Sequence, residues 1–178
     1  MGKIKNPMPV KIFCGFIYKD AEIILKVEEK LKERWGKIDF VSYPLPFNFT
    51  DYYSEEMGKN LMRKFISFSK IILPEKLWEW KIFTNKVEEE FLENGKRKVN
   101  IDPGYLDLSK IVLLSTKDFY HRIYLGNGIY AEVTMYFSKG KYQFFPWTYP
   151  DYRTENYIRF FENIRELYSK QLKNENVN

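Results

Sequence analysis

The spacing of hydrophobic positions along the chain predicts a mixture of strands and helices. The run VKIFCGFIY, residues 10–18, is continuously apolar and rich in β-branched and aromatic residues, which is typical of a strand buried on both faces. Apolar residues then recur at helical spacing over 20–35, where Asp20 provides an N-cap and Gly36 a stop. The chain therefore begins with a central strand that is followed by an amphipathic helix.

Two more strands and a second helix are expected in the middle of the chain. Residues 37–43 predict a strand that ends at two prolines, and the alternating segment 63–72 predicts another. Between them, residues 48–60 are expected to form a polar and aromatic loop. A stripe of apolar residues predicts a helix over 74–94, with Pro74 at its first position.

The next segments complete an order of elements that indicates a fold. Residues 98–106 are expected to be extended, with a break at Pro103-Gly104, and residues 109–116 predict a fourth apolar strand. The order β-α-β-β-α-β is typical of a ferredoxin-like fold, in which two helices cover one face of an antiparallel sheet. The sequence therefore predicts an α+β protein with a ferredoxin-like core.

The C-terminal third is expected to extend this core. Turns at Asn127-Gly128 and Lys139-Gly140 predict two β-hairpins, because glycine, and asparagine in the first turn, tolerate the positive φ angles of tight hairpin turns. A last amphipathic helix is expected after Thr154. The predicted architecture is thus a ferredoxin-like core that is enlarged by two hairpins and closed by a C-terminal helix.

Composition supports a folded domain and restricts its partners only mildly. Of the 178 residues, 44% are hydrophobic, so we expect one domain over 1–178 with its core at 8–172 and a frayed tail at 173–178. The formal net charge of +5 would help an anionic ligand or a nucleic acid to approach. The lone Cys14 cannot form an internal disulfide, and neither a membrane span nor a signal-peptide core is present, so a cytoplasmic location and no membrane partner are expected.

The first hairpin carries the only histidine of the chain and an acid on an otherwise apolar strand. His121 is expected on its first strand and Glu132 on its returning strand. A two-residue turn would make His121 and Glu132 diagonal neighbours, whereas a three-residue turn would place Arg122 opposite Glu132. In either register Glu132 gains a cationic or titratable neighbour, as a buried acid requires.

Further polar residues near this hairpin are candidates for a shared site. His121, Glu132 and Asp118 are the candidates for catalysis, because a carboxylate beside an imidazole suits general acid–base chemistry or a divalent metal. The candidates for holding an anionic ligand or cofactor are Asp102, Tyr105, Lys110, Lys117, Arg122 and Asp151. Each also has a structural explanation, such as a turn acid for Asp102 or a hydrogen-bonding role for His121. The sequence specifies no particular metal or cofactor.

Several nucleotide and metal motifs are absent from the sequence. There is no G-x-x-x-x-G-K-[ST] string and no G-x-G-x-x-G string, and the GNG at 126–128 is better explained as a turn. The TKDF at 116–119 lacks the acid that the guanine-reading [NT]-K-x-D motif requires, because Phe119 stands in its place. One cysteine and one histidine exclude the usual structural zinc site. We therefore expect no GTP binding through a P-loop.

Four strings in the chain together resemble one protein family. They are VNIDPGYLDLSKIVLLSTKDFYHRIYLGNGIYAEVTMYF, PWTYPDYR, FNFTDYYSEEMG and IFTNKVEEE. In this combination they resemble the prokaryotic family of unknown function DUF4416, over about residues 5–172. The resemblance implies no known activity, catalytic residue or cofactor, although members often carry the automatic label "GTP-binding protein". The strings coincide with the segments that supply the candidate residues, which favours a site there.

Three kinds of function remain open from the sequence. The first is a small-ligand-binding protein or enzyme, with an anionic ligand such as a nucleotide in a polar pocket around residues 102–132. The second is a nucleic-acid-binding module that stacks bases on exposed sheet aromatics. The third is a homo-oligomeric assembly module with a tyrosine-rich interface. The orientation of Tyr124, Tyr130 and Tyr136 distinguishes them. A concave pocket with buried acids favours a small ligand, an open aromatic face surrounded by lysines favours nucleic acid, and a flat apolar patch favours self-assembly.

Overall fold

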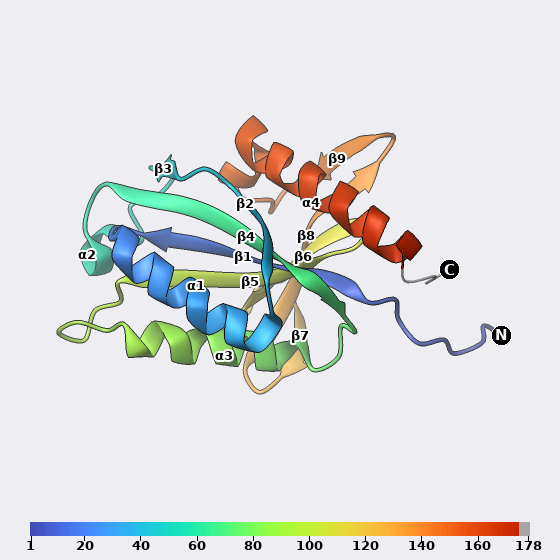
Figure 1. Ribbon diagram of the computed structural model, residues 1–178, viewed down its shortest axis with the longest axis horizontal. Helices are drawn as coiled ribbons and strands as arrows, with labels where there is room; N and C mark the ends of the chain where they lie inside the picture. Colours follow the sequence, from blue (N-terminus) through green and yellow to red (C-terminus); the bar gives the residue numbers. More distant parts are fainter. Residues whose placement is uncertain (175–178) are drawn as a thin grey trace.

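One antiparallel sheet organises the protein (Figure 1). The computed structural model describes residues 1–174, which contain nine strands, four α-helices and one short 3-10 helix. The elements follow in this order: β1 Val10–Tyr18, α1 Ala21–Trp35, β2 Ile38–Val41, β3 Leu45–Phe47, α2 Ser54–Met57, β4 Leu61–Ile72, α3 Leu77–Glu90, β5 Val99–Leu106, β6 Lys110–Ser115, β7 Ile123–Gly126, β8 Ile129–Ser138, β9 Lys141–Phe144, η1 Asp151–Arg153 and α4 Glu155–Asn174. The predicted α+β class is confirmed.

The strand order places β1 in the interior of the sheet. The order is β2-β4-β1-β5-β6-β8-β7, with β3 paired to β4 and β9 paired to β8, and every pairing is antiparallel. The four runs predicted as strands, 10–18, 37–43, 63–72 and 109–116, all contribute to this sheet. Every residue of β1 is buried, as its continuous apolar run predicted.

Helices cover both faces of the sheet, and each face has its own core. On one face, Cys14 of β1 belongs to a cluster with Val27 of α1 and Trp80 of α3. On the other face, Phe65 of β4 belongs to a cluster with Phe161 of α4. Figure 1 shows this division, with α1 and α3 on one side of the sheet and α4 on the other. The two helices of the predicted β-α-β-β-α-β unit therefore share one face.

The second predicted helix and the preceding loop differ in detail from the prediction. Helix α3 begins at Leu77 rather than at Pro74, because Lys76 adopts a left-handed conformation with φ 50° just before it. The helix ends at Glu90, before a turn rather than at Gly95. The loop predicted over 48–60 contains the short helix α2.

The largest difference from the prediction concerns residues 98–106. This segment contains a full strand, β5, which lies between β1 and β6 and is not broken at Pro103 or Gly104. A Cβ atom on Gly104 would lie 2.4 Å from the carbonyl oxygen of Val112, so glycine allows β5 and β6 to approach closely. The strand next to β1 is therefore β5, and the segment predicted as the fourth strand is the sixth strand in chain order, β6.

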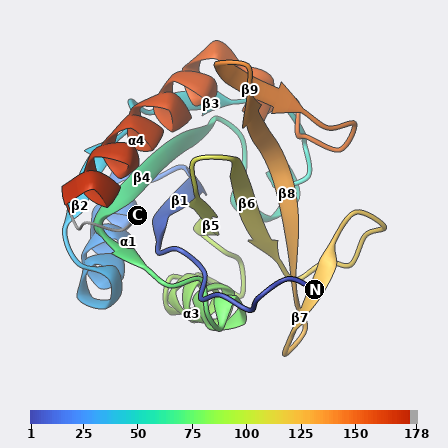
Figure 2. The same cartoon turned by 90° about the vertical axis from the view of Figure 1, so that its right-hand side faces the viewer.

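The C-terminal elements follow the prediction closely. Both hairpin turns are present, and their residues have positive φ angles: 53° at Asn127, 76° at Gly128, 52° at Lys139 and 78° at Gly140. Helix α4 continues to Asn174, so the first two residues of the tail predicted at 173–178 are helical; 175–178 lie outside the described residues. Figure 2 shows the β7 hairpin projecting from one edge of the sheet. Across residues 1–174, no helix is long and apolar enough to span a membrane.

A buried lysine joins the edge of the sheet to the last helix. The side chain of Lys11 has no exposed surface, and its Nζ atom donates hydrogen bonds to Asp39 at 2.6 Å, to the carbonyl of Phe68 at 2.9 Å and to Gln171 at 3.0 Å. Burial lowers the pKa of Lys11, and the bond to Asp39 partly opposes this effect. The lysine thus connects β1 with β2, β4 and α4.

This arrangement predicts unequal effects when the two partners are removed. Asp39→Ala should lower the free energy of unfolding by about 3 kcal/mol, because it leaves a buried ammonium without its counter-charge. Lys11→Met should change it by less than about 1 kcal/mol, because it removes the buried charge and preserves much of the packing. Urea unfolding of both variants measures the difference. Equal losses in the two variants would contradict a dominant role for the buried charge.

Candidate functional site

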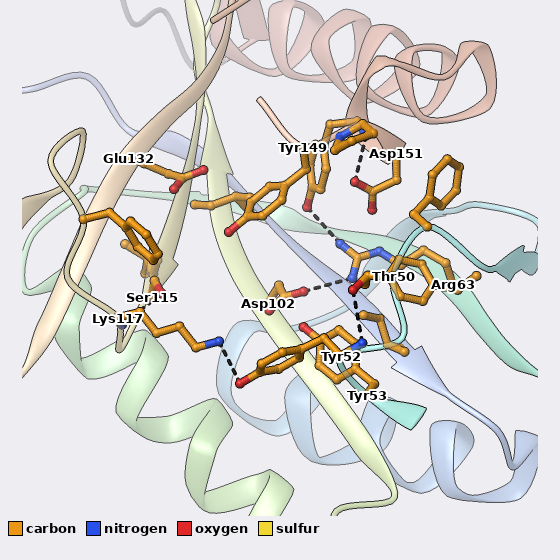
Figure 3. A pocket seen from close by; sticks show the side chains of 18 of the residues that line it. Thr50, Tyr52, Tyr53, Arg63, Asp102, Ser115, Lys117, Glu132, Tyr149 and Asp151 are labelled. Carbon is orange, nitrogen blue, oxygen red and sulfur yellow. Dashed lines mark hydrogen bonds and ion pairs between the residues drawn. The ribbon is translucent and has the colours of Figure 1, made fainter. Parts of the chain in front are cut away.

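A cavity of about 380 Å³ lies where the ends of several strands meet the segments 47–53 and 149–152. Its walls are mainly apolar and aromatic, formed by Ile17, Phe47, Phe49, Tyr52, Tyr53, Leu113, Leu114, Phe119, Tyr149, Pro150 and Tyr152. Its polar groups are Thr50, Arg63, Asp102, Ser115, Lys117, Arg122, Glu132 and Asp151. An apolar cavity of this size with a few convergent polar groups is typical of a small-molecule site. Figure 3 shows how these side chains surround it.

Arg63 forms the floor of the cavity. It projects from β4 and is only 2% exposed. Its Nη1 atom donates to Asp102 of β5 at 2.9 Å, and its Nη2 atom donates to the hydroxyl of Tyr152 at 2.9 Å. The guanidinium also lies 4.6 Å from the centroid of the Phe65 ring. One buried cation therefore joins β4, β5 and the segment before α4.

A glycine makes this connection possible. Strand β1 lies between β4 and β5, so the Arg63 side chain must cross it to reach Asp102. It crosses at Gly15, where an added Cβ atom would lie 2.8 Å from Nη2 of Arg63 and 2.7 Å from Cε1 of Phe65. Both distances are shorter than van der Waals contact. The absence of a side chain at Gly15 therefore leaves the space that the guanidinium occupies.

The two acids near Arg63 are shifted in opposite directions. Burial favours the neutral form of Asp102, but Arg63 and then Lys81 outweigh it and hold the pKa of Asp102 below its ordinary value. Burial raises the pKa of Asp151, and Arg63 opposes this only in part. Asp151 is 6% exposed and has no cation within salt-bridge distance among residues 1–174. Of the carboxyl groups that line the cavity, Asp102 thus has a lowered pKa and Asp151 a raised one.

Glu132 and Arg122 form the opposite wall. Glu132 is buried on β8 and accepts hydrogen bonds from Nε of Arg122 at 2.8 Å and from the hydroxyl of Thr134 at 3.1 Å. Arg122 also donates to Ser115, to the carbonyl of Lys117 and to the hydroxyl of Tyr149. Most of its donors are therefore used to hold the wall of the cavity together.

The hairpin register combines the two alternatives considered from the sequence. The turn has two residues, since Gly126 pairs with Ile129, but an irregularity between Tyr124 and Gly126 then shifts the pairing so that Ile123 faces Ala131. In this shifted register, the next residue along, Arg122, lies opposite Glu132. The bulge explains how a two-residue turn leads to the pairing expected for a three-residue one.

His121 lies behind this wall, in a turn before β7 rather than on the predicted strand. Its Nε2 atom is 3.1 Å from Oε2 of Glu132, and its ring stacks on Trp147 with 5.1 Å between centroids. Its Nδ1 atom is buried and has no hydrogen-bond partner among residues 1–174. His121 does not line the cavity, but it contacts two residues that do: Glu132, and Phe119, on whose ring it stacks with 5.9 Å between centroids.

Lys117 stands at the opening of the cavity. Its Nζ atom donates to the hydroxyl of Tyr52 at 2.8 Å and lies 4.0 Å from the centroid of that ring. No carboxylate of the described chain lies within salt-bridge distance of it. The lysine is therefore held in place by an uncharged partner, and its charge is not neutralised by a neighbouring acid.

A second cavity of about 340 Å³ adjoins the first and reaches toward α3. The two cavities share the lining residues Tyr52, Tyr53, Asp102, Leu114, Ser115, Lys117 and Tyr149. Here Glu88 is buried and accepts hydrogen bonds from the amide of Ile101 at 2.6 Å and from Arg97 at 3.2 Å. Arg97 also binds both carboxylate oxygens of Glu56, which fixes α2 beside the opening. The charged groups of this second cavity are thus largely paired with one another.

The structure brings together some of the residues predicted from the sequence and separates others. Asp102, Lys117, Arg122, Glu132 and Asp151 line the first cavity. Four candidates, His121, Asp118, Tyr105 and Lys110, do not. Asp118 is exposed, Tyr105 packs against the core under α1 and α3, and Lys110 pairs with Asp107 in a turn.

Sequence reasoning missed Arg63 and the aromatic wall. Arg63 lies on the same face of β4 as the buried residues Leu61 and Phe65. The alternation of positions along this strand was the signal that could have identified Arg63 as buried. Tyr52 and Tyr53 lie in the string FNFTDYYSEEMG, which was assigned only to a loop. Within the described range 1–174, no cluster of three or more His, Cys, Asp or Glu side chains is arranged to hold a metal ion.

Comparison with known proteins identifies a family but no characterised relative. A family model described as "Domain of unknown function (DUF4416)" matches residues 8–168. No curated protein and no solved structure matches the chain. The match covers most of the chain, including every residue that lines the first cavity.

The floor of the cavity yields a test at Gly15. Alanine in place of glycine within a strand is usually stabilising by about 0.4–1 kcal/mol where the backbone permits it. Here Gly15→Ala should instead lower the free energy of unfolding by about 2–4 kcal/mol, because the new methyl group displaces Arg63 from Asp102. Denaturant unfolding measures this loss.

A double-mutant cycle serves as the control for this prediction. In an Asp102→Asn background the Arg63 pair is already weakened, so the same Gly15→Ala change should cost less than in the wild type. Additive losses would show that the methyl group acts by crowding Phe65 alone and not through the ion pair.

Proposed function

The chain belongs to the DUF4416 family, whose function is unknown, and we propose that it binds a small organic anion in the cavity above Arg63. The charges of the cavity support an anionic ligand. Arg63 is neutralised by Asp102 and Arg122 by Glu132, and burial raises the pKa of Asp151, which weakens its tendency to carry a negative charge. Lys117 is the cation that remains, and this observation carries the proposal.

The walls indicate the rest of the ligand. Tyr52, Phe119 and Tyr149 belong to an aromatic lining that suits a flat, largely apolar body. Lys117 stands at the opening, where an anionic group of such a ligand can reach it and remain partly hydrated. Aromatic carboxylates and nucleotides both have this combination of flat body and charge. The absence of a glycine-rich phosphate loop means that any nucleotide would bind by stacking and through Lys117 rather than through a P-loop.

We further propose that a ferredoxin-like core carries this site. The strand order β2-β4-β1-β5 with α1 and α3 on one face supports that description. Arg63 and Asp102 project from β4 and β5 of this unit, whereas Lys117, Arg122 and Glu132 come from the strands and loops that follow it. The additional C-terminal elements therefore complete the cavity.

A binding experiment with a defined probe tests the proposed function. Naphthalene-2-carboxylate combines a flat bicyclic body with one negative charge, and its binding can be followed by NMR titration. Lys117→Gln should weaken its affinity about tenfold or more, because a charge-assisted contact is lost. Lys110→Gln is the matched control, since Lys110 pairs with Asp107 away from the cavity, and it should leave affinity unchanged. Failure of the wild type to bind the probe, or equal loss in both variants, would contradict the proposal.

A second candidate function, self-association, is favoured by the exposed edge of the sheet. The β7 hairpin presents Tyr120, Ile123 and Tyr124 with 85%, 71% and 59% of their surface exposed. Exposed apolar side chains on an unpaired edge strand can pair with the same edge of a second copy. Nucleic-acid binding, the other assembly expected from the sequence, would use the same rings for stacking on bases.

Sedimentation measurements test the association of this edge. If β7 pairs with a second copy, the wild type should form a dimer that Ile123→Lys reduces to a monomer, because the charge opposes edge pairing. Leu25→Lys, at another exposed apolar residue on α1, is the control and should leave the dimer intact. A monomeric wild type would exclude this function, and RNA that co-purifies until high salt removes it would favour nucleic-acid binding instead.

A further inference from the structure

Asp151 has surroundings that the proposed anion site does not explain. It belongs to η1, lines the first cavity and is almost fully buried. Its Oδ1 atom accepts a hydrogen bond from the amide of Tyr152 at 3.1 Å. Its Oδ2 atom has no hydrogen-bond partner among residues 1–174. This atom is also not among the fully buried polar atoms of these residues that lack a partner, so part of its surface is accessible. One oxygen of this carboxyl is therefore open to the cavity.

The neighbours of Asp151 leave it without a counter-charge. The charged and titratable groups that face it are Arg63 of β4, Asp102 of β5, Tyr152 and, from α4, Tyr157. Arg63 directs its two Nη atoms to Asp102 and Tyr152, so it forms no ion pair with Asp151. A buried carboxyl without a paired cation favours the protonated form, which is a hydrogen-bond donor.

We propose that Asp151 determines which ligands bind, by donating the proton of its neutral carboxyl to an uncharged acceptor on the ligand. The inference rests on the proposed function and makes the ligand class more specific: a flat anion whose end remote from the charge carries a ring nitrogen or a carbonyl oxygen. Figure 3 supports this polarity, because Lys117 and Asp151 lie on opposite sides of the cavity. A ligand with a second negative charge at the Asp151 end would bind less well, because the carboxylate of Asp102 would repel that charge.

A matched pair of probes tests the assignment directly. Quinoline-6-carboxylate has the shape of naphthalene-2-carboxylate, but a ring nitrogen replaces one C–H group at the end remote from the carboxylate. At about pH 6.5 this nitrogen is an uncharged acceptor, and the wild type should bind the quinoline about tenfold more tightly, the gain expected of one buried hydrogen bond.

Three variants separate the role of Asp151 from a general effect on the cavity. Asp151→Leu keeps a similar branched shape, is somewhat larger and has no donor, so it should bind both probes equally. Asp151→Asn keeps an N–H donor and should retain the preference for the quinoline. Asp118→Asn changes an exposed acid outside the cavity and should behave as the wild type. Equal binding of both probes by the wild type, or a preference that survives in Asp151→Leu, would overturn the assignment while the proposed function stands. Failure of both probes to bind would overturn the proposed function itself.

The pH dependence of stability and of ligand preference gives a second measurement. Because burial raises the folded-state pKa of Asp151 above its unfolded value, its contribution to stability is complete below the unfolded pKa and is lost as pH rises through the folded pKa. Asp151→Asn should therefore lose less stability than the wild type over a range of rising pH that starts near the unfolded pKa of about 4, as measured by thermal melting. The wild type should also lose its preference for the quinoline over the upper part of this range, whereas Asp151→Asn should not. Parallel stability curves for the two proteins would show that Asp151 has the same pKa in the folded and unfolded states and would overturn the proposal.

Discussion

The hydrogen bond between Arg63 and Asp102 is the contact on which the candidate site depends. A guanidinium that is almost completely buried is costly to leave unpaired, and here it reaches its carboxylate across a neighbouring strand. This path requires that β1 have no side chain at Gly15. It also requires Tyr152, which receives the second donor of Arg63 and thereby fixes the segment before α4 against the sheet. One ion pair thus sets the positions of four parts of the chain around the cavity.

A second ion pair has the corresponding role on the other wall. Arg122 binds Glu132 of β8, the end of β6 at Ser115 and the hydroxyl of Tyr149. Because each arginine neutralises one acid, the two pairs contribute shape and rigidity to the cavity and little net charge. The character of the site then comes from the two groups that have no such partner, Lys117 and Asp151. A cation at the opening and a buried acid with a raised pKa in the interior together favour a ligand whose two ends differ in charge.

The surroundings of the site explain why these groups stay where they are. The Glu56–Arg97 pair holds α2 beside the opening, and the bond from Lys117 to Tyr52 holds the loop before it. Behind Arg63, the aromatic cluster of Phe65, Tyr157 and Phe161 excludes water from the face that α4 covers. Burial of this kind strengthens charge interactions at the floor of the cavity and shifts the pKa of Asp151 upward. Packing of the second core is therefore part of the chemistry of the site.

The sequence by itself determined the elements whose signals are local. The continuous apolar run 10–18 identified the interior strand, and the two glycine turns identified the hairpins, because backbone conformation and side-chain period act over a few residues. Glu132, an acid on an otherwise apolar strand, likewise predicted a cationic or titratable neighbour. The pairing of Glu132 with Arg122, however, depended on a bulge that no local signal predicts.

Tertiary structure alone decided the centre of the site. Arg63 and Asp102 are 39 residues apart in the chain, and β1, which separates their strands, lies a further 45 residues or more before either of them. Only the strand order brings them into contact, and only the missing side chain at Gly15 makes the contact possible. The same holds for β5. From the sequence, Pro103-Gly104 predicted a break in this extended segment, whereas in the sheet these residues belong to a continuous strand that lies close to its neighbour. Local preference predicts an element, whereas a site formed by side chains from distant segments depends on how the sheet orders them in space.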